Sequence, residues 1–139
     1  ETLHAAEHLL AHGATGVVLM ERGVRTFEDA TRFTFDANAV ALLKARTHLP
    51  VFVDPSHATG RRELLLPVAR AGAALGADGV MLEVHPAPAD AKSDGKQSLP
   101  LAALSPMLRE LTPVVHAMGR ALHTPDPSVV DHNGPRSHR

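Results

Sequence analysis

The feature that most constrains the fold is the stretch from residue 51 to residue 60, where a short apolar strand runs into a polar turn. Residues 51–53 are apolar and include two valines, which is typical of a buried strand. Asp54-Pro55 ends this strand, because the residue before a proline avoids the helical region and proline donates no ladder hydrogen bond. In parallel α/β proteins ligands collect at this edge of the sheet, so the stretch predicts functional groups just after the strand.

The same strand-then-helix pattern occurs three times along the chain. It predicts strands and helices that alternate, after a first helix at 2–12, in this order: strand 17–20, helix 37–46, strand 51–53, helix 61–75, strand 80–84, helix 105–122. Right-handed crossovers between such units make the strands parallel, so the pattern indicates an α/β fold. A closed (β/α)₈ barrel needs about 250 residues. The 139 residues hold only three βα units, which is too few to close such a barrel.

Composition excludes several classes of function. The net charge of −1 gives no basis for binding nucleic acid, and the absence of cysteine excludes disulfides and thiolate metal sites. No apolar run approaches the ~20 residues that cross a bilayer, and no signal peptide is visible, so we expect a cytoplasmic protein with no membrane partner. Residues 124–139 are rich in proline and polar groups and predict a disordered tail. The chain does not begin with methionine, which suggests a fragment.

Two polar residues near the strand ends are ambiguous when each is taken alone. Arg22 follows the first strand and could clamp a phosphate or carboxylate, or it could form a surface ion pair with Glu21 or Glu28. His57 follows the second strand and could serve a site or be an ordinary loop histidine. The neighbouring motifs decide between these interpretations.

Three motifs together point to one family. They are E-R-G-V-R-T-F-E at 21–28, D-P-S-H-A-T-G-R-R at 54–62 and S-D-G-K-Q at 93–97. In this order and spacing they resemble 3-deoxy-D-arabino-heptulosonate 7-phosphate (DAHP) synthase, type I-beta branch, over about residues 1–119. The resemblance implies that residues 1–123 are the C-terminal portion of that enzyme, forming the last three βα units of a (β/α)₈ TIM barrel. It also implies a transferase that condenses phosphoenolpyruvate with erythrose 4-phosphate in the shikimate pathway, and a homo-oligomer when complete.

The resemblance also implies a site. Its metal ligands are His57, Glu83 and Asp94, one imidazole and two carboxylates, which suit Mn²⁺, Fe²⁺, Co²⁺ or Zn²⁺. His57 and Asp54 are expected to be catalytic, with Asp54 orienting a ligand. Arg22 is expected to bind the phosphate of phosphoenolpyruvate, with Glu21 beside it as a second substrate-binding residue. The family's fourth metal ligand is a cysteine on the first barrel strand, which this chain lacks.

Two other interpretations remain open. The chain could resemble 3-deoxy-D-manno-octulosonate 8-phosphate synthase, which shares the E-R-G motif and the histidine at a strand end. It could also be a non-enzymatic remnant, because most strands of a barrel are missing. We expect the isolated chain to be an incomplete enzyme.

Overall fold

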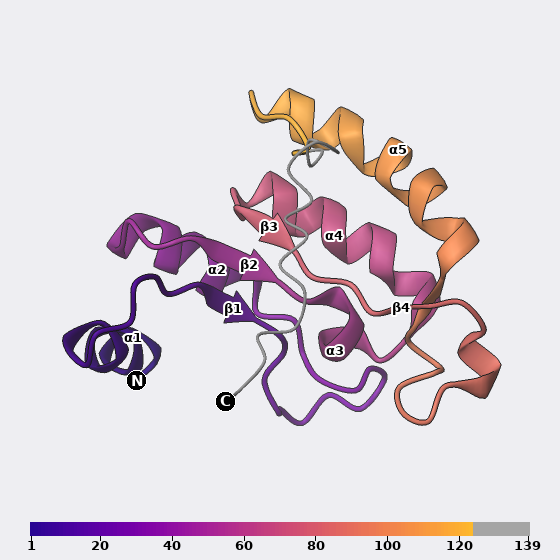
Figure 1. The fold of residues 1–139 in the computed structure, drawn as a ribbon, viewed down its shortest axis with the longest axis horizontal. Helices are drawn as coiled ribbons and strands as arrows, with labels where there is room; N and C mark the ends of the chain where they lie inside the picture. The colour runs from indigo at the N-terminus through magenta and orange to yellow at the C-terminus, as the bar shows by residue number, and fades with distance from the viewer. Residues whose placement is uncertain (124–139) are drawn as a thin grey trace, which may run out of the picture.

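The structure, a computed structural model, describes residues 1–123, so the predicted disordered tail at 124–139 lies outside the described residues. Helices and short strands alternate along the chain (Figure 1). The elements are α1 (Thr2–Ala11), β1 (Leu19–Glu21), α2 (Ala37–Arg46), β2 (Val51–Val53), α3 (Pro55–Thr59), η1 (Arg62–Leu64), α4 (Leu65–Ala74), β3 (Gly79–Val80), β4 (Val84–His85), η2 (Pro88–Asp90), β5 (Leu99–Pro100) and α5 (Leu101–Ala117).

All strand pairs in these two sheets are parallel, so the predicted α/β class is confirmed. β1, β2 and β3 form one sheet in that order, with Leu19 opposite Val51 and Val53 opposite Val80. β4 pairs with β5 in a second, two-stranded sheet. Since every strand points the same way within its sheet, the segments that follow β1 and β2 leave the three-stranded sheet at one edge.

The prediction for the third strand was incomplete. Instead of one strand at 80–84, the chain forms β3 at 79–80 and, after a break, β4 at 84–85. The partner of β4 is β5, which sequence reasoning missed altogether. β5 has only two residues and one of them is Pro100, so it shows none of the alternation that marks a strand. The described residues therefore contain five short strands where the sequence predicted three.

The helix boundaries also differ from the prediction. Residues 55–59, predicted as a loop, form the short helix α3, which begins at a proline whose missing N–H is harmless there. The helix predicted at 61–75 begins as a 3₁₀ turn and becomes α4 only at Leu65, which places Pro67 in the first turn. The last helix was predicted to start at Ser105, but α5 starts at Leu101 and runs through Pro106 and Pro113.

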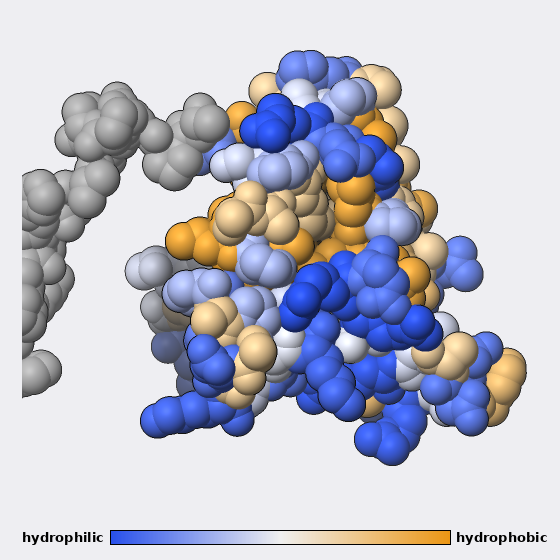
Figure 2. Space-filling view, turned by 90° about the vertical axis from the view of Figure 1, so that its right-hand side faces the viewer, coloured by the Kyte–Doolittle hydropathy of each residue, from blue (hydrophilic) through white to orange (hydrophobic). Residues whose placement is uncertain are grey.

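Two apolar clusters hold the fold together. One joins α1 and α2 to β1 and β2 and has Val40, Val51 and Val53 fully buried at its centre. The other packs α4 against α5, which lie side by side in Figure 1, around Leu65 and Leu111. On the side that carries α5, Figure 2 shows apolar side chains gathered between hydrophilic regions. None of the helices in the described part of the chain has the length and apolar character needed to cross a bilayer.

The long loop after β1 folds back onto α3, and glycines allow this contact. Gly23 has φ +91°, and a Cβ there would lie 2.5 Å from Cβ of Phe33 and 3.0 Å from Cα of Ala58. The backbone N–H groups of Arg32 and Phe33 donate to the carbonyls of Thr59 and Ala58 at 3.0 and 2.8 Å. The loop and the helix that carries His57 are thus one packed unit.

Candidate metal centre

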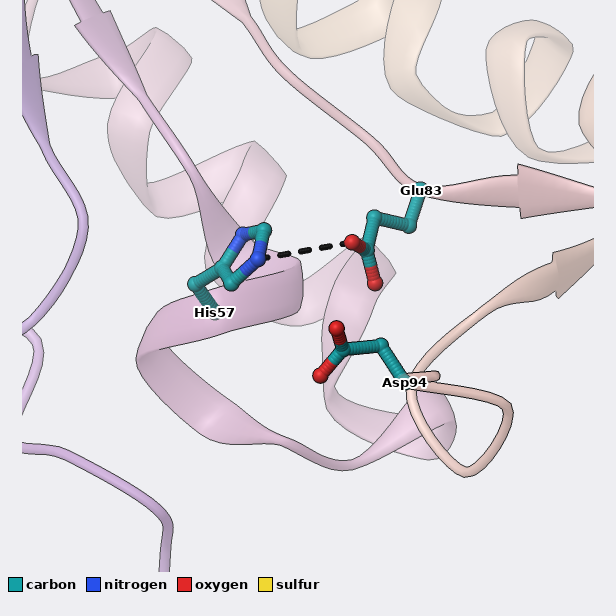
Figure 3. A group of neighbouring side chains, drawn as sticks. All are labelled: His57, Glu83 and Asp94. Atoms are coloured by element: carbon teal, nitrogen blue, oxygen red, sulfur yellow. Dashed lines mark ion pairs between the residues drawn. The ribbon is translucent and has the colours of Figure 1, made fainter. Parts of the chain in front are cut away.

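The structure brings together the three predicted metal ligands, which come from three separate segments. His57 lies in α3, Glu83 lies between β3 and β4, and Asp94 lies in the loop before β5 (Figure 3). One potential ligand atom from each side chain lies within 4.8 Å of the other two. Nε2 of His57 is 3.4 Å from Oε1 of Glu83. The side chains are 15%, 28% and 31% exposed, so solvent and small molecules can reach them.

Asp54 fixes the orientation of His57. Its carboxylate is fully buried and caps α3, where Oδ1 accepts from the backbone N–H of His57 at 3.0 Å. Oδ2 lies 2.6 Å from Nδ1 of the same histidine. Because a carboxylate only accepts, Nδ1 carries a proton, and in the neutral imidazole this leaves the lone pair on Nε2, the nitrogen that faces Glu83. This is the arrangement in which an imidazole can bind a metal through Nε2.

Glu83 is held at both its backbone and its side chain. Its backbone N–H donates to Oγ of Ser56 at 3.0 Å, and Ser56 is fully buried in α3. Its Oε2 accepts from the amide Nε2 of Gln97 at 2.8 Å. The position of the Glu83 carboxylate therefore depends on Ser56 and Gln97, two residues that carry no charge.

Asp94 lies in a tight turn with an unusual backbone. It is the one residue other than glycine with positive φ (55°) among residues 1–123. Its carbonyl accepts from the backbone N–H groups of Gln97 and Ser98, and its Oδ1 accepts from Nη1 of Arg32 at 2.9 Å. Aspartate tolerates this left-handed conformation better than most residues, and the surrounding hydrogen bonds hold it.

Arg22 and Glu21 lie at the same edge of the sheet but point differently. Nε of Arg22 is 3.7 Å from Oδ2 of Asp54, and the arginine side chain is 55% exposed, so it lies beside the histidine and remains accessible. Glu21 is buried, and its Oε1 accepts from the backbone N–H groups of Gly23 and Asp36. Within the described residues its Oε2 is buried without a hydrogen-bond partner. Burial raises the pKa of the Glu21 carboxyl, and the two backbone hydrogen bonds oppose that rise.

Sequence reasoning did not assign three residues that the geometry ties to the site. Ser56 and Gln97 lie inside the motifs quoted for the family, which was a usable signal. Arg32 lies in a polar loop with no local signal, yet its side chain reaches Asp94, 62 residues further along the chain. His85, whose ring Nδ1 accepts from the backbone N–H of Ala87, is engaged in its own turn.

The donor set fits a divalent cation. One neutral imidazole nitrogen and two carboxylate oxygens are the ligands that Mn²⁺, Fe²⁺, Co²⁺ and Zn²⁺ accept, and the histidine already has the required tautomer. The three ligands leave further coordination positions open to substrate or to other groups. The arrangement could therefore hold a catalytic ion rather than one enclosed for structural support.

Comparison with known proteins identifies the family. The model of the DAHP synthetase I family matches residues 1–117. The phospho-2-dehydro-3-deoxyheptonate aldolase of Thermotoga maritima is 47% identical over 119 residues, covering 86% of this chain and 35% of that protein. A 2-dehydro-3-deoxyphosphooctonate aldolase of Acidithiobacillus ferrooxidans is less similar, with 31% identity over 129 residues, 85% of this chain and 45% of that protein.

A solved structure agrees with this assignment. A truncated form of 3-deoxy-D-arabino-heptulosonate 7-phosphate synthase from Thermotoga maritima superposes with a TM-score of 0.83 at 45% identity. The superposition covers 87% of this chain and 46% of that one. The chain thus spans less than half of the length of these relatives. By family model, sequence and fold, it belongs to the DAHP synthetase I family.

Proposed function

We propose that this chain supplies the metal-binding edge of a DAHP synthase, which condenses phosphoenolpyruvate with erythrose 4-phosphate. The observation that carries the proposal is the convergence of His57, Glu83 and Asp94 from three segments of a chain in this family. The relative with the higher identity is named for the seven-carbon product rather than the eight-carbon one, which favours the four-carbon aldose phosphate as co-substrate.

The metal is the cofactor in this proposal, and the three side chains hold it. When bound, a divalent ion would act as a Lewis acid that polarises the aldehyde oxygen of the aldose phosphate. Asp54 keeps the Nε2 lone pair of His57 available, and the two carboxylates supply negative charge that retains the cation. Loading the protein with Mn²⁺, Fe²⁺, Co²⁺ and Zn²⁺ in turn will identify the ion that supports activity.

Arg22 is the proposed contact for the phosphate of phosphoenolpyruvate. Its half-exposed guanidinium lies at the same edge as His57, next to Asp54, and a guanidinium matches the geometry of phosphate oxygens. Glu21 is better suited to bracing the turn that presents Arg22, since its Oε1 accepts from the backbone of Gly23. We therefore propose an indirect part in substrate binding for Glu21.

The barrel itself is part of the proposal. We infer that residues 1–123 form the C-terminal part of a (β/α)₈ barrel, with β5 adding a strand to the three βα units that the sequence predicted. The parallel strands and the similarity to a DAHP synthase structure support this inference. Val18, half exposed beside β1, and Phe27, fully exposed in the following loop, offer apolar surface to the rest of the barrel or to another subunit of a homo-oligomer.

The test is a measurement of product. The complete protein, loaded with each metal in turn, is given phosphoenolpyruvate with either a four-carbon or a five-carbon aldose phosphate, and phosphate release and product mass are followed. We expect metal-dependent phosphate release with the four-carbon substrate and a seven-carbon product. The His57→Ala variant should lose this activity, whereas His116→Ala, in α5 away from the site, should keep it. Turnover that is equal without metal, or that occurs only with the five-carbon substrate, would contradict the proposal.

A further inference from the structure

Two side chains outside the ligand set, Arg32 and Gln97, connect the two carboxylates of the candidate metal centre. Gln97 is buried, and its amide is used at both ends: Nε2 donates to Oε2 of Glu83 at 2.8 Å, and Oε1 accepts from Nη1 of Arg32 at 3.0 Å. The same Nη1 donates to Oδ1 of Asp94 at 2.9 Å. A guanidinium can only donate and a carboxylate can only accept, so these neighbours fix which way the amide of Gln97 faces.

Arg32 is itself held in place by the helix that carries His57. Its backbone N–H donates to the carbonyl of Thr59 at 3.0 Å, and its guanidinium lies 5.5 Å from the centre of the Phe33 ring. Gly60 admits the side chain, because a Cβ there would lie 2.8 Å from Cβ of Arg32. The loop segment that carries Arg32 is therefore anchored to α3, and this anchoring holds the guanidinium next to Asp94.

We propose that Arg32 and Gln97 are positioning residues that aim Glu83 and Asp94 at the metal. Each takes one oxygen of a carboxylate, which leaves the other oxygen of that carboxylate for the ion. The remaining oxygen of Glu83, Oε1, is the one that lies 3.4 Å from Nε2 of His57. The inference rests on the proposed function, because it needs a metal at this site.

The positive charge of Arg32 also affects the repulsion between the carboxylates of Glu83 and Asp94. Two carboxylates held close together without a cation repel each other, which disfavours the geometry that the metal needs. The guanidinium of Arg32 lies against Asp94 and is joined through Gln97 to Glu83, so it offsets part of this repulsion before any ion binds. The ligand set is preorganised by this contact, and preorganisation raises affinity by lowering the cost of ordering the ligands.

The turn that carries Asp94 does not depend on Arg32 for its fold. Arg62 donates from Nε to the carbonyl of Ser98 at 2.6 Å and from Nη2 to the carbonyl of Gly95 at 2.9 Å. Oγ of Ser98 also donates to the carbonyl of Asp94 at 3.0 Å. Substitution of Arg32 should therefore leave the loop folded and change only where the Asp94 carboxylate points.

The test uses Co²⁺ as the probe, because its visible absorption reports the number and geometry of its ligands. Co²⁺ is titrated into the complete protein and into Arg32→Ala, Arg32→Lys and Gln97→Met variants, the last of which keeps the length of the side chain without its amide. Arg70→Ala is the matched control, since Arg70 also pairs with a carboxylate, Glu110, at similar exposure but between α4 and α5. Thermal unfolding without metal checks that each variant folds.

We expect Arg32→Ala and Gln97→Met to weaken Co²⁺ binding about 10- to 100-fold and to change its spectrum, as loss of a residue that orients a ligand does in other metal sites. Arg32→Lys should restore part of the affinity. A variant that combines Arg32→Ala with Gln97→Met should be little worse than either single one, because the two residues act in one network. Arg70→Ala should bind like the unmodified protein.

Two results would count against different claims. If the unmodified protein binds no Co²⁺, the metal centre itself fails, and this inference fails with it. If the unmodified protein binds Co²⁺ and Arg32→Ala gives the same affinity and spectrum, the metal centre stands and the positioning role is refuted. Arg32→Ala alone decides the matter if Gln97→Met does not fold, because Arg32 is 44% exposed and its loss opens no cavity in the core.

Discussion

Replacing Asp54 by asparagine tests how the chain fixes the tautomer of His57. The Asp54 carboxylate accepts from both the backbone N–H and the ring Nδ1 of the histidine. An asparagine amide has one acceptor and one donor group, so it cannot accept at both places. If its oxygen keeps the helix cap, its NH₂ faces Nδ1 and favours the proton on Nε2. The lone pair that would bind the metal is then lost.

The magnitude follows from the hydrogen bond that changes. A hydrogen bond to a charged group contributes about 1.5–3 kcal/mol, which corresponds to about 10- to 150-fold in an equilibrium constant. Residues that orient a metal-bound histidine affect metal affinity by about 10- to 100-fold. We therefore expect Asp54→Asn to weaken metal binding 10-fold or more. The free energy of unfolding should change less than the metal affinity, because asparagine caps a helix about as well as aspartate.

The assay combines a structural and a binding measurement. NMR of the imidazole nitrogens in the metal-free protein reports which nitrogen of His57 carries the proton, and calorimetric titration with Mn²⁺ or Zn²⁺ gives the affinity. Asp36→Asn is the matched control, since Asp36 also caps a helix through its Oδ1, accepting from the N–H of Ala39, but within residues 1–123 it forms no hydrogen bond with a histidine. We expect the proton on Nδ1 in the control and on Nε2 in Asp54→Asn.

The reasoning would be refuted if Asp54→Asn kept the proton on Nδ1 and bound metal within twofold of the unmodified protein. Such a result would mean that other contacts set the tautomer. A protonated Nε2 with unchanged affinity would be equally damaging, because it would remove His57 from the ligand set.

Three further predictions concern other parts of the chain. Arg22→Ala should raise the KM for phosphoenolpyruvate about 10- to 150-fold by removing a charged contact, and steady-state kinetics with an unchanged KM would exclude Arg22 from the site. Burial acts to raise the pKa of Asp78, but hydrogen bonds from a lysine, a backbone N–H and an arginine outweigh it and lower that pKa. The stability that Asp78 contributes is therefore present above about pH 4 and lost below it, so urea unfolding of Asp78→Asn should depend less on pH in that range. Gly72→Ala would put a Cβ 2.5 Å from Cγ2 of the buried Val53, so the overpacking cost of about 1–3 kcal/mol should exceed the helix gain of up to about 1 kcal/mol and lower the melting temperature, whereas Gly16→Ala, with open space around it, should not.

Local patterns in the sequence were sufficient for the main elements and for naming three candidate ligands that the structure brings together. The apolar runs ending at Glu21 and at Asp54 predicted β1 and β2 within two residues, because a buried strand needs apolar residues. Pro55 also stops β2. The pattern of residues 37–46 predicted α2 with the bounds that the structure has, and Asp36 caps this helix through the backbone N–H of Ala39. The family resemblance named His57, Glu83 and Asp94 as candidate ligands, and two of them, His57 and Asp94, lie inside the motifs that carry it.

Only the tertiary structure decided how these parts meet. A strand as short as β5 has no periodic pattern of its own and is defined by its pairing with β4. The backbone N–H of Leu99 donates to the carbonyl of Glu83 in this pairing. The contacts of Arg32 with Asp94 and Gln97 join residues more than 60 positions apart, so no local rule could anticipate them. The inward direction of Glu21 likewise depends on the N–H groups that the loop after β1 presents to it. Periodicity and capping act over a few residues, whereas the orientation of a ligand depends on which distant donors the folded chain brings within hydrogen-bonding distance.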